Sequence, residues 1–77
     1  MKYQICLINN KILEVDGESK MQYPYLSGSI ERTAELKIQD FNFNTLKKYN
    51  MITILIANKK IHIPTSSIVY VEATPTQ

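Results

Sequence analysis

Apolar and polar positions alternate through much of the chain, and the strongest pattern lies in residues 51–73. Residues 51–57 are apolar on both faces of an extended backbone, which is typical of a central strand. Asn58-Lys59 predicts a turn, and residues 60–63 return as a second strand with apolar side chains at every other position. The pattern therefore predicts a β-hairpin around which the other elements are arranged.

The end of this segment predicts one more strand. Pro64 cannot donate a hydrogen bond to a strand ladder, so we expect it to end the preceding strand. Residues 65–67 then form a single tight turn. Residues 68–73 form the closing strand, with Val69 and Val71 predicted to share one face.

A similar hairpin is predicted at the beginning of the chain. Residues 2–8 alternate between two faces of a strand. Asn9-Asn10 provides the positive φ angles that a tight hairpin turn requires. Residues 11–16 continue as a second strand, with its apolar side chains inward and its carboxylates outward.

Residues 17–28 have the least regular pattern and contain both glycines of the chain. Pro24 restricts Tyr23 to an extended conformation. We predict a long surface loop here. Because binding residues concentrate on loops that a rigid scaffold holds, this loop is the predicted binding surface.

Residues 29–38 are compatible with either a strand or a helix. Polar side chains occupy every second position, and the positions between them are apolar except for Arg32. A period of two predicts a strand with one solvated face. The competing helix would leave Leu36 outside its apolar stripe, so we favour the strand.

Residues 40–50 predict a short α-helix. Either Asn42 or Asn44 is suited to cap its beginning, and Lys47 and Lys48 suit the negative end of the helix dipole. Four apolar side chains are expected to hold the helix over one mouth of a barrel: Phe41, Phe43, Leu46 and Tyr49.

Length and composition indicate a single small domain over residues 1–77, with residues 74–77 as a frayed tail. A chain this short buries only about 60 % of its unfolded surface, so self-association is an expected source of further burial. The formal net charge of +2 is too small to indicate a dedicated nucleic-acid module. No apolar run reaches the length of a membrane span. The single cysteine, Cys6, fits a reducing, cytoplasmic location.

The order of these elements predicts a mainly β fold (β with one short α-helix): a small, partly open β-barrel of about 5–6 strands. The last strand, single turn and closing strand resemble the end of SH3-like and Sm-like barrels. The segment I-H-I-P-T-S-S-I-V-Y-V-E also resembles a hairpin of LytTR-type DNA-binding domains. That likeness covers about the last third of the chain, and we assign the chain to no family on these resemblances.

Few residues have catalytic potential. His62 is the only imidazole, and its apolar neighbours place it on the outer face of a strand. Cys6 has no histidine near it in the sequence and is expected to be a small buried hydrophobe. No phosphate-binding glycine loop, zinc pattern or nucleophile elbow is present. We therefore predict that the protein is not an enzyme and uses no metal or cofactor.

The leading functional hypothesis is a non-catalytic module that binds a protein partner. Tyrosine gives a large contact area at low entropic cost and is enriched at interfaces. Alternatively, the two loop tyrosines cover an open end of the barrel. A module this small is typical of accessory proteins of phages and mobile elements that inhibit a host or defence protein by stoichiometric binding. The predicted partner-binding residues are Lys20, Tyr23, Tyr25 and Leu26.

Two alternatives come from other functional classes. The first is nucleic-acid binding, with lysine-bearing turns at one rim of the barrel and tyrosines that stack on bases. The even spread of lysines among acidic residues favours a solubilising surface instead. The second is a homo-oligomer that sequesters a small ligand between subunits. The residues of the nucleic-acid alternative are Lys47, Lys48, Lys59, Lys60, Tyr49 and Tyr70.

Overall fold

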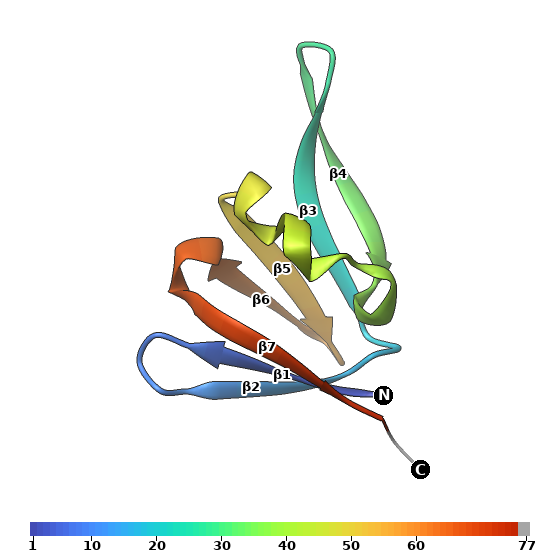
Figure 1. Ribbon diagram of the computed structural model, residues 1–77. Coiled ribbons are helices and arrows are strands. Elements are labelled where there is room, and N and C mark those ends of the chain that lie inside the picture. The colour runs from blue at the N-terminus through green and yellow to red at the C-terminus, as the bar shows by residue number, and fades with distance from the viewer. Residues whose placement is uncertain (76–77) are drawn as a thin grey trace.

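The computed structural model describes residues 1–75, most of which lie in seven strands that form two antiparallel sheets (Figure 1). One sheet has the order β2-β1-β7 and the other the order β4-β3-β5-β6. The fold is mainly β, as predicted, with more strands than the sequence indicated. The strands are β1 (Lys2–Leu7), β2 (Ile12–Asp16), β3 (Lys20–Ser27), β4 (Ile30–Lys37), β5 (Met51–Ile56), β6 (Lys59–Pro64) and β7 (Ile68–Thr74).

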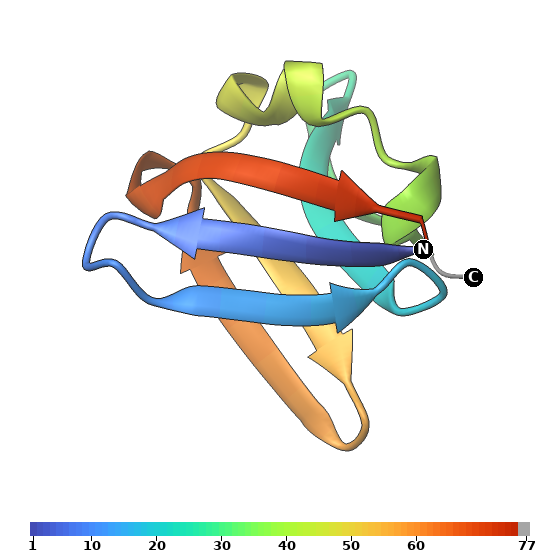
Figure 2. The same ribbon diagram turned by 60° about the horizontal axis from the view of Figure 1, so that its bottom comes forward.

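The first and last strands pair within the three-stranded sheet. Lys2 lies opposite Thr74, so β7 extends one residue into the predicted tail. Residues 76–77 of that tail lie outside the described residues. The strands of the three-stranded sheet cross those of the other sheet obliquely (Figure 2). As predicted, Pro64 ends a strand and a single 3₁₀ turn, η3 (Thr65–Ser67), leads into β7.

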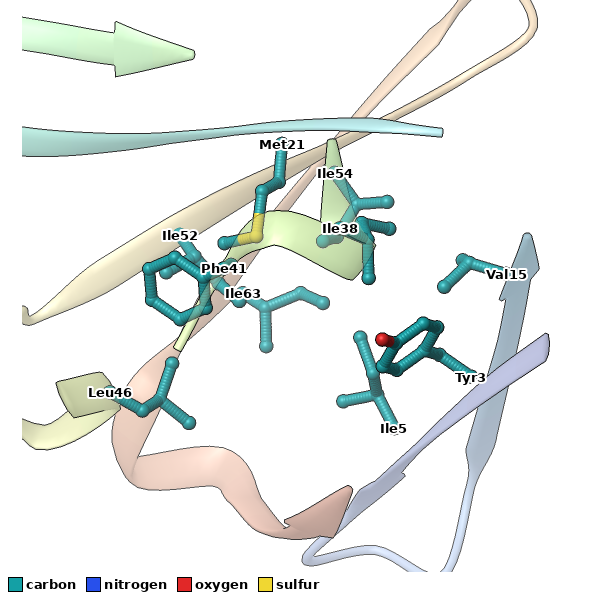
Figure 3. Packing of buried hydrophobic residues seen from close by; sticks show 10 residues of the cluster. All are labelled: Tyr3, Ile5, Val15, Met21, Ile38, Phe41, Leu46, Ile52, Ile54 and Ile63. Carbon is teal, nitrogen blue, oxygen red and sulfur yellow. The ribbon is translucent and has the colours of Figure 1, made fainter. Parts of the chain in front are cut away.

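The core lies between the two sheets and is entirely apolar (Figure 3). Strands β1, β2, β3, β5 and β6 contribute residues at alternate positions, as the alternating pattern requires. Ile5 of β1 and Met21 of β3 are fully buried, and so are Ile52 and Ile54 of β5. The other buried members are Tyr3, Val15, Ile38, Phe41, Leu46 and Ile63.

The predicted loop over residues 17–28 is wrong. Residues 17–19 alone form a connection, residues 20–27 form the eight-residue strand β3, and Gly28 begins the turn that follows. Pro24 pairs with Thr33 of β4 without a register shift. Pairing of β3 with β5 ends at Gln22, so on that side Pro24 faces no strand. A proline is tolerated there because no ladder hydrogen bond is lost.

The connection leaves little room for a side chain at Gly17. A Cβ added at Gly17 would lie 3.1 Å from both the Met1 carbonyl oxygen and the Gln39 side-chain oxygen. The Gly17 N–H donates to that Met1 carbonyl at 2.8 Å, and the Gly17 carbonyl accepts from the Gln39 N–H at 3.1 Å. These backbone hydrogen bonds therefore join the connection both to the residue before β1 and to the 3₁₀ turn after β4.

The strand predicted over residues 29–38 is confirmed as β4, and its helical alternative is wrong. The α-helix predicted over residues 40–50 is also wrong. None of the described residues is α-helical, and two 3₁₀ turns, η1 (Ile38–Asp40) and η2 (Phe43–Lys48), occupy this segment. The Asn42 side chain accepts a hydrogen bond from the Asn44 N–H at 3.0 Å, so Asn42 is the cap.

The predicted facing of the last strand is wrong because β7 contains a bulge. Cys6 lies opposite Tyr70 while its neighbour Leu7 lies opposite Ile68, which leaves Val69 without a partner on β1. The extra residue shifts the alternation. Ile68 and Val71 therefore pack against the core, and Val69 is 62 % exposed.

The two hairpin turns form at the predicted asparagines, but the second turn is shifted by one residue. Asn10 has a φ of +66°, the left-handed conformation that asparagine tolerates. The second turn consists of Ala57 and Asn58 instead of Asn58 and Lys59. Ala57 takes the positive φ, at +51°.

Candidate protein-binding site

The β3–β4 hairpin extends beyond the sheet to which it belongs. Pairing between β3 and β5 stops at Gln22, whereas β3 and β4 remain paired to Ser27 and Ile30. Figure 1 shows this outer part, residues 23–34, projecting away from the rest of the molecule. We call it the distal hairpin. It contributes to the 42 Å longest dimension of a molecule that measures 25 Å in the other two directions.

Large apolar side chains gather at the tip of the distal hairpin. Leu26 is 72 % exposed, Ile30 58 % and Tyr25 39 %. Single exposed apolar residues are normal on a protein surface. In the β3–β4 register, Tyr25 and Ile30 lie on one face of the hairpin and Leu26 on the other, so the tip exposes apolar side chains on both faces. The predicted site residues Tyr25 and Leu26 both lie at this tip.

A groove lies beside the tip. Its volume is about 330 Å³, and its walls come from β3, β4 and the chain that leaves η2. The groove brings Tyr25 and Leu26 together with Lys48 and Tyr49, two residues that the sequence placed in the nucleic-acid alternative. The lining residues are Pro24, Tyr25, Leu26, Glu31, Lys48, Tyr49 and Asn50.

Tyr23 has a different environment from Tyr25. Its ring centroid lies 4.7 Å from that of Tyr49 and 5.4 Å from that of Phe41. Tilted ring pairs at these distances are attractive beyond their buried area. Tyr23 is half-buried and anchors the base of the distal hairpin to the core. The contacts of Tyr23 are those of the alternative interpretation, in which the tyrosine covers the core.

Lys20 lies at the far end of β3 from the tip. It is six residues from Leu26, a separation of about 20 Å along a strand. Its ammonium group lies 3.6 Å from a carboxylate oxygen of Glu35, and both side chains are exposed. Lys20 therefore does not share a surface with the other three predicted partner-binding residues.

Polar side chains cross the middle of the outer face of the four-stranded sheet. The Gln22 amide donates to the Glu35 carboxylate at 2.9 Å, and this bond is the main cause that lowers the pKa of Glu35. The nearby charge of Lys20 lowers it further. On the neighbouring strands β5 and β6, the Thr53 hydroxyl and His62 Nδ1 are hydrogen-bonded at 2.9 Å. His62 is exposed on this outer face, as predicted.

The lysines of the nucleic-acid alternative do not gather at one rim. Met51 pairs with Pro64 and Ile56 pairs with Lys59, so Lys59 and Lys60 lie at the end of the β5–β6 hairpin away from η2. Lys47 and Lys48 end η2, close to the opposite end of that hairpin. The structure thus splits this residue set into separate surfaces.

The two tyrosines of that set are also apart. Tyr49 belongs to the aromatic cluster of Tyr23 and Phe41. Tyr70 lies on β7, where it shares a groove of about 320 Å³ with Lys47. Its hydrogen bond with the Cys6 thiol is the largest cause that raises the pKa of Tyr70, and the charges of Cys6 and Glu72 add to it. Cys6 is buried and forms no disulfide among the described residues.

The sequence interpretation missed Ile30 and Glu31 as members of the site because it assigned the hairpin's two strands to different elements. Two signals for the hairpin are present in the chain. Residues 20–27 alternate, with Met21, Tyr23 and Tyr25 at every second position. Gly28 and Ser29 then form a two-residue turn, a combination that favours a hairpin.

Comparison of the chain with protein-family models, with curated proteins and with solved structures gave no match. In residues 1–75, no three or more His, Cys, Asp or Glu side chains are grouped so that they could hold a metal ion. The described part of the chain also has no helix with the length and apolar character needed to cross a membrane.

Proposed function

We propose that the protein is a non-catalytic binding module whose contact surface is the tip of the distal hairpin. One observation supports this above all others. The hairpin continues past its last pairing with β5 and carries Tyr25, Leu26 and Ile30 exposed at its end. Apolar residues of this size contribute nothing to the core from that position, whereas burial by a partner would remove them from water.

The expected partner is a protein with an apolar cleft. A projecting hairpin is convex, so it inserts into a concave surface, and the groove beside it can receive a side chain from the rim of that cleft. The aromatic contacts of Tyr23 hold the hairpin base in place before binding. Such preorganisation reduces the entropic cost of association.

The mode of action in this proposal is occupancy of the partner's surface. A phage or mobile-element accessory protein that inhibits a host or defence protein would act in this way, in a cytoplasm that keeps Cys6 reduced. We also propose that the two sheets form a partly open barrel of the SH3-like or Sm-like kind. The pairing of β1 with β7 and the 3₁₀ turn before β7 support that fold.

The test is a tip variant that keeps strand propensity. Leu26→Thr with Ile30→Thr removes the apolar tip, and Ile12→Thr with Val69→Thr is the matched control. The control residues are 58 % and 62 % exposed on the other sheet. Wild type and both variants are used as baits in the native host. The affinity of each for the recovered protein is then measured by calorimetry with purified components.

The tip variant should bind about 30-fold more weakly or worse, because an interface hot spot contributes about 2 kcal/mol or more. The control should bind like the wild type, and circular dichroism should show both variants folded. Equal binding by wild type and tip variant would reject the tip as the contact surface. Capture of nucleic acid that salt releases steeply would instead favour the lysine-based alternative.

A further inference from the structure

β4 is a long and regular sheet edge. It forms one end of the four-stranded sheet, is eight residues long, contains no proline and pairs with β3 without a register shift. Exposed edges template pairing with another chain, and native proteins usually block them. The other edge strands in the described part of the chain are shorter or less regular: β2 has five residues, β7 has seven and a bulge, and β6 has six and ends at Pro64.

The turn identifies the backbone groups that face outward from β4. Gly28 has a φ of +66° and begins a two-residue turn closed by Ser27 and Ile30. A turn of this kind closes on a hydrogen-bonded pair, and such pairs recur at every second residue. The residues between them direct their N–H and C=O groups to the free edge. They are Glu31, Thr33, Glu35 and Lys37.

Charge selects one register for pairing between two copies of this edge. In a two-fold antiparallel pair, one residue lies opposite itself. With Thr33 on the axis, Glu31 would lie opposite Glu35 of the second copy, and like charges across a strand pair are destabilising. With Arg32 on the axis, two guanidinium groups would meet. With Ala34 on the axis, Glu31 lies opposite Lys37 of the second copy, and its symmetry mate repeats the pair.

We propose that two copies of the chain pair β4 to β4 antiparallel about a two-fold axis at Ala34, which joins their four-stranded sheets into one. In this register the outward groups of Thr33 bond with those of Glu35 in the second copy. The exposed Ile30 lies next to Leu36 of the second copy along the paired strands. Pairing therefore removes part of the Ile30 side chain from water. The partner of this edge is a second copy of the chain. The charges along β4 are complementary to the same charges read in the opposite direction.

Two single-charge variants test the register. Glu31→Lys places lysine opposite Lys37, and Lys37→Glu places glutamate opposite Glu31, so each variant alone should be monomeric. Mixed in equal amounts, the two variants restore both attractive pairs and should form a heterodimer. Glu72→Lys on β7 is the control for net charge, because it makes the same change away from β4.

Sedimentation equilibrium over a concentration series gives the result. Wild type and Glu72→Lys should rise from 8.9 kDa toward twice that mass, and each β4 variant should stay at 8.9 kDa until the two are mixed. A wild type that stays monomeric at millimolar concentration would overturn the proposal. Tighter association of Glu31→Lys would also overturn it, because that result requires the Thr33 register, where lysine meets Glu35.

A backbone variant tests the edge independently of charge. Thr33→Pro removes an outward N–H, which an edge strand tolerates. It should abolish self-association, and its thermal unfolding should remain cooperative. Unchanged self-association of Thr33→Pro would place the contact elsewhere and overturn the proposal. This inference goes beyond the proposed function, and the two can fail separately, because Leu26→Thr alone changes the tip on β3 and leaves every residue of β4 unchanged.

Discussion

At the scale of single residues, the β5–β6 turn contains a strained position. Ala57 has a φ of +51°, a conformation that costs an L-residue with a Cβ about 1–2 kcal/mol. Ala57→Gly removes that cost and adds the conformational entropy of glycine to the unfolded state. We expect a net increase in the free energy of unfolding of about 0.5–1 kcal/mol, measured from the urea midpoint at constant m-value.

Gly28→Ala is the matched control for this prediction. Gly28 has a φ of +66°, and no atom lies within 4 Å of an added Cβ. The substitution therefore imposes the backbone cost without a steric clash, and it should lower the free energy of unfolding by about 1 kcal/mol. The prediction requires that Ala57→Gly raises the free energy of unfolding and that Gly28→Ala lowers it. A destabilised Ala57→Gly would contradict the assigned turn conformation.

Glu18 and Lys37 form a close ion pair, with 2.8 Å between Nζ and Oε2. The hydrogen bond from Lys37 is the largest cause that lowers the pKa of Glu18, followed by the lysine's charge and a hydrogen bond from Gln39. The same contacts with Glu18 raise the pKa of Lys37. The pair links the connection between the sheets to the end of β4.

Lys37→Gln should raise the pKa of Glu18 toward its ordinary value in an NMR titration of the side-chain carboxyl carbon. Because the folded-state pKa is lowered, the pair stabilises the fold above the unfolded-state pKa, and this contribution is lost as pH falls through the folded-state value. Both side chains are exposed, so the effect on stability is small. Lys11→Gln, at the other end of β2, should leave the Glu18 titration unchanged.

At the scale of elements, the two tyrosines of β3 have different roles. Tyr23 packs against Phe41 and Tyr49, whereas Tyr25 lies at the exposed tip. Tyr23→Ala should lower the free energy of unfolding by about 3 kcal/mol, as large-to-small changes of packed aromatic residues do. Tyr25→Ala should change it by less than about 1 kcal/mol. Equal effects in thermal denaturation would mean that the distal hairpin packs on the core.

Elements with strong local signals could be predicted from the sequence. The hairpins of β1–β2 and β5–β6, the stop at Pro64 and the strand β4 all follow from short-range alternation and turn residues. β3 was not predicted because Pro24 is unfavourable in a strand unless its missing N–H faces an unpaired side. That condition depends on where β5 ends relative to β3, which is a tertiary relation.

The prediction of an α-helix over residues 40–50 was wrong for a related reason. Its capping asparagine and its lysines were correctly placed, but these signals are shared by α-helices and 3₁₀ turns. Phe41, Leu46 and Tyr49 must all reach the same core from a short connection between β4 and β5. Two tight 3₁₀ turns satisfy those contacts, and the choice between helix types is made by packing.

At the scale of the whole molecule, the sequence predicted a scaffold with a separate binding segment. Only some of the predicted binding residues lie at the tip of the distal hairpin. Tyr25 and Leu26 were predicted as binding residues because residues 17–28 were interpreted as a loop, and the structure places both at the exposed tip of a hairpin instead. Ile30 was assigned to the buried face of its strand, where the alternation placed it. The sequence pattern cannot show that this strand extends past the sheet that would bury it.

The projection of the distal hairpin has a consequence for how this protein can change. Substitutions at Leu26 or Ile30 alter no core contact, so they carry almost no penalty in stability. Mutations that would otherwise be removed because they unfold a small, marginally stable domain are tolerated at this tip. A lineage under pressure from a changing partner can therefore sample new tip sequences on an unchanged scaffold, and the same property makes the tip a suitable place to insert randomised sequences for selected binders.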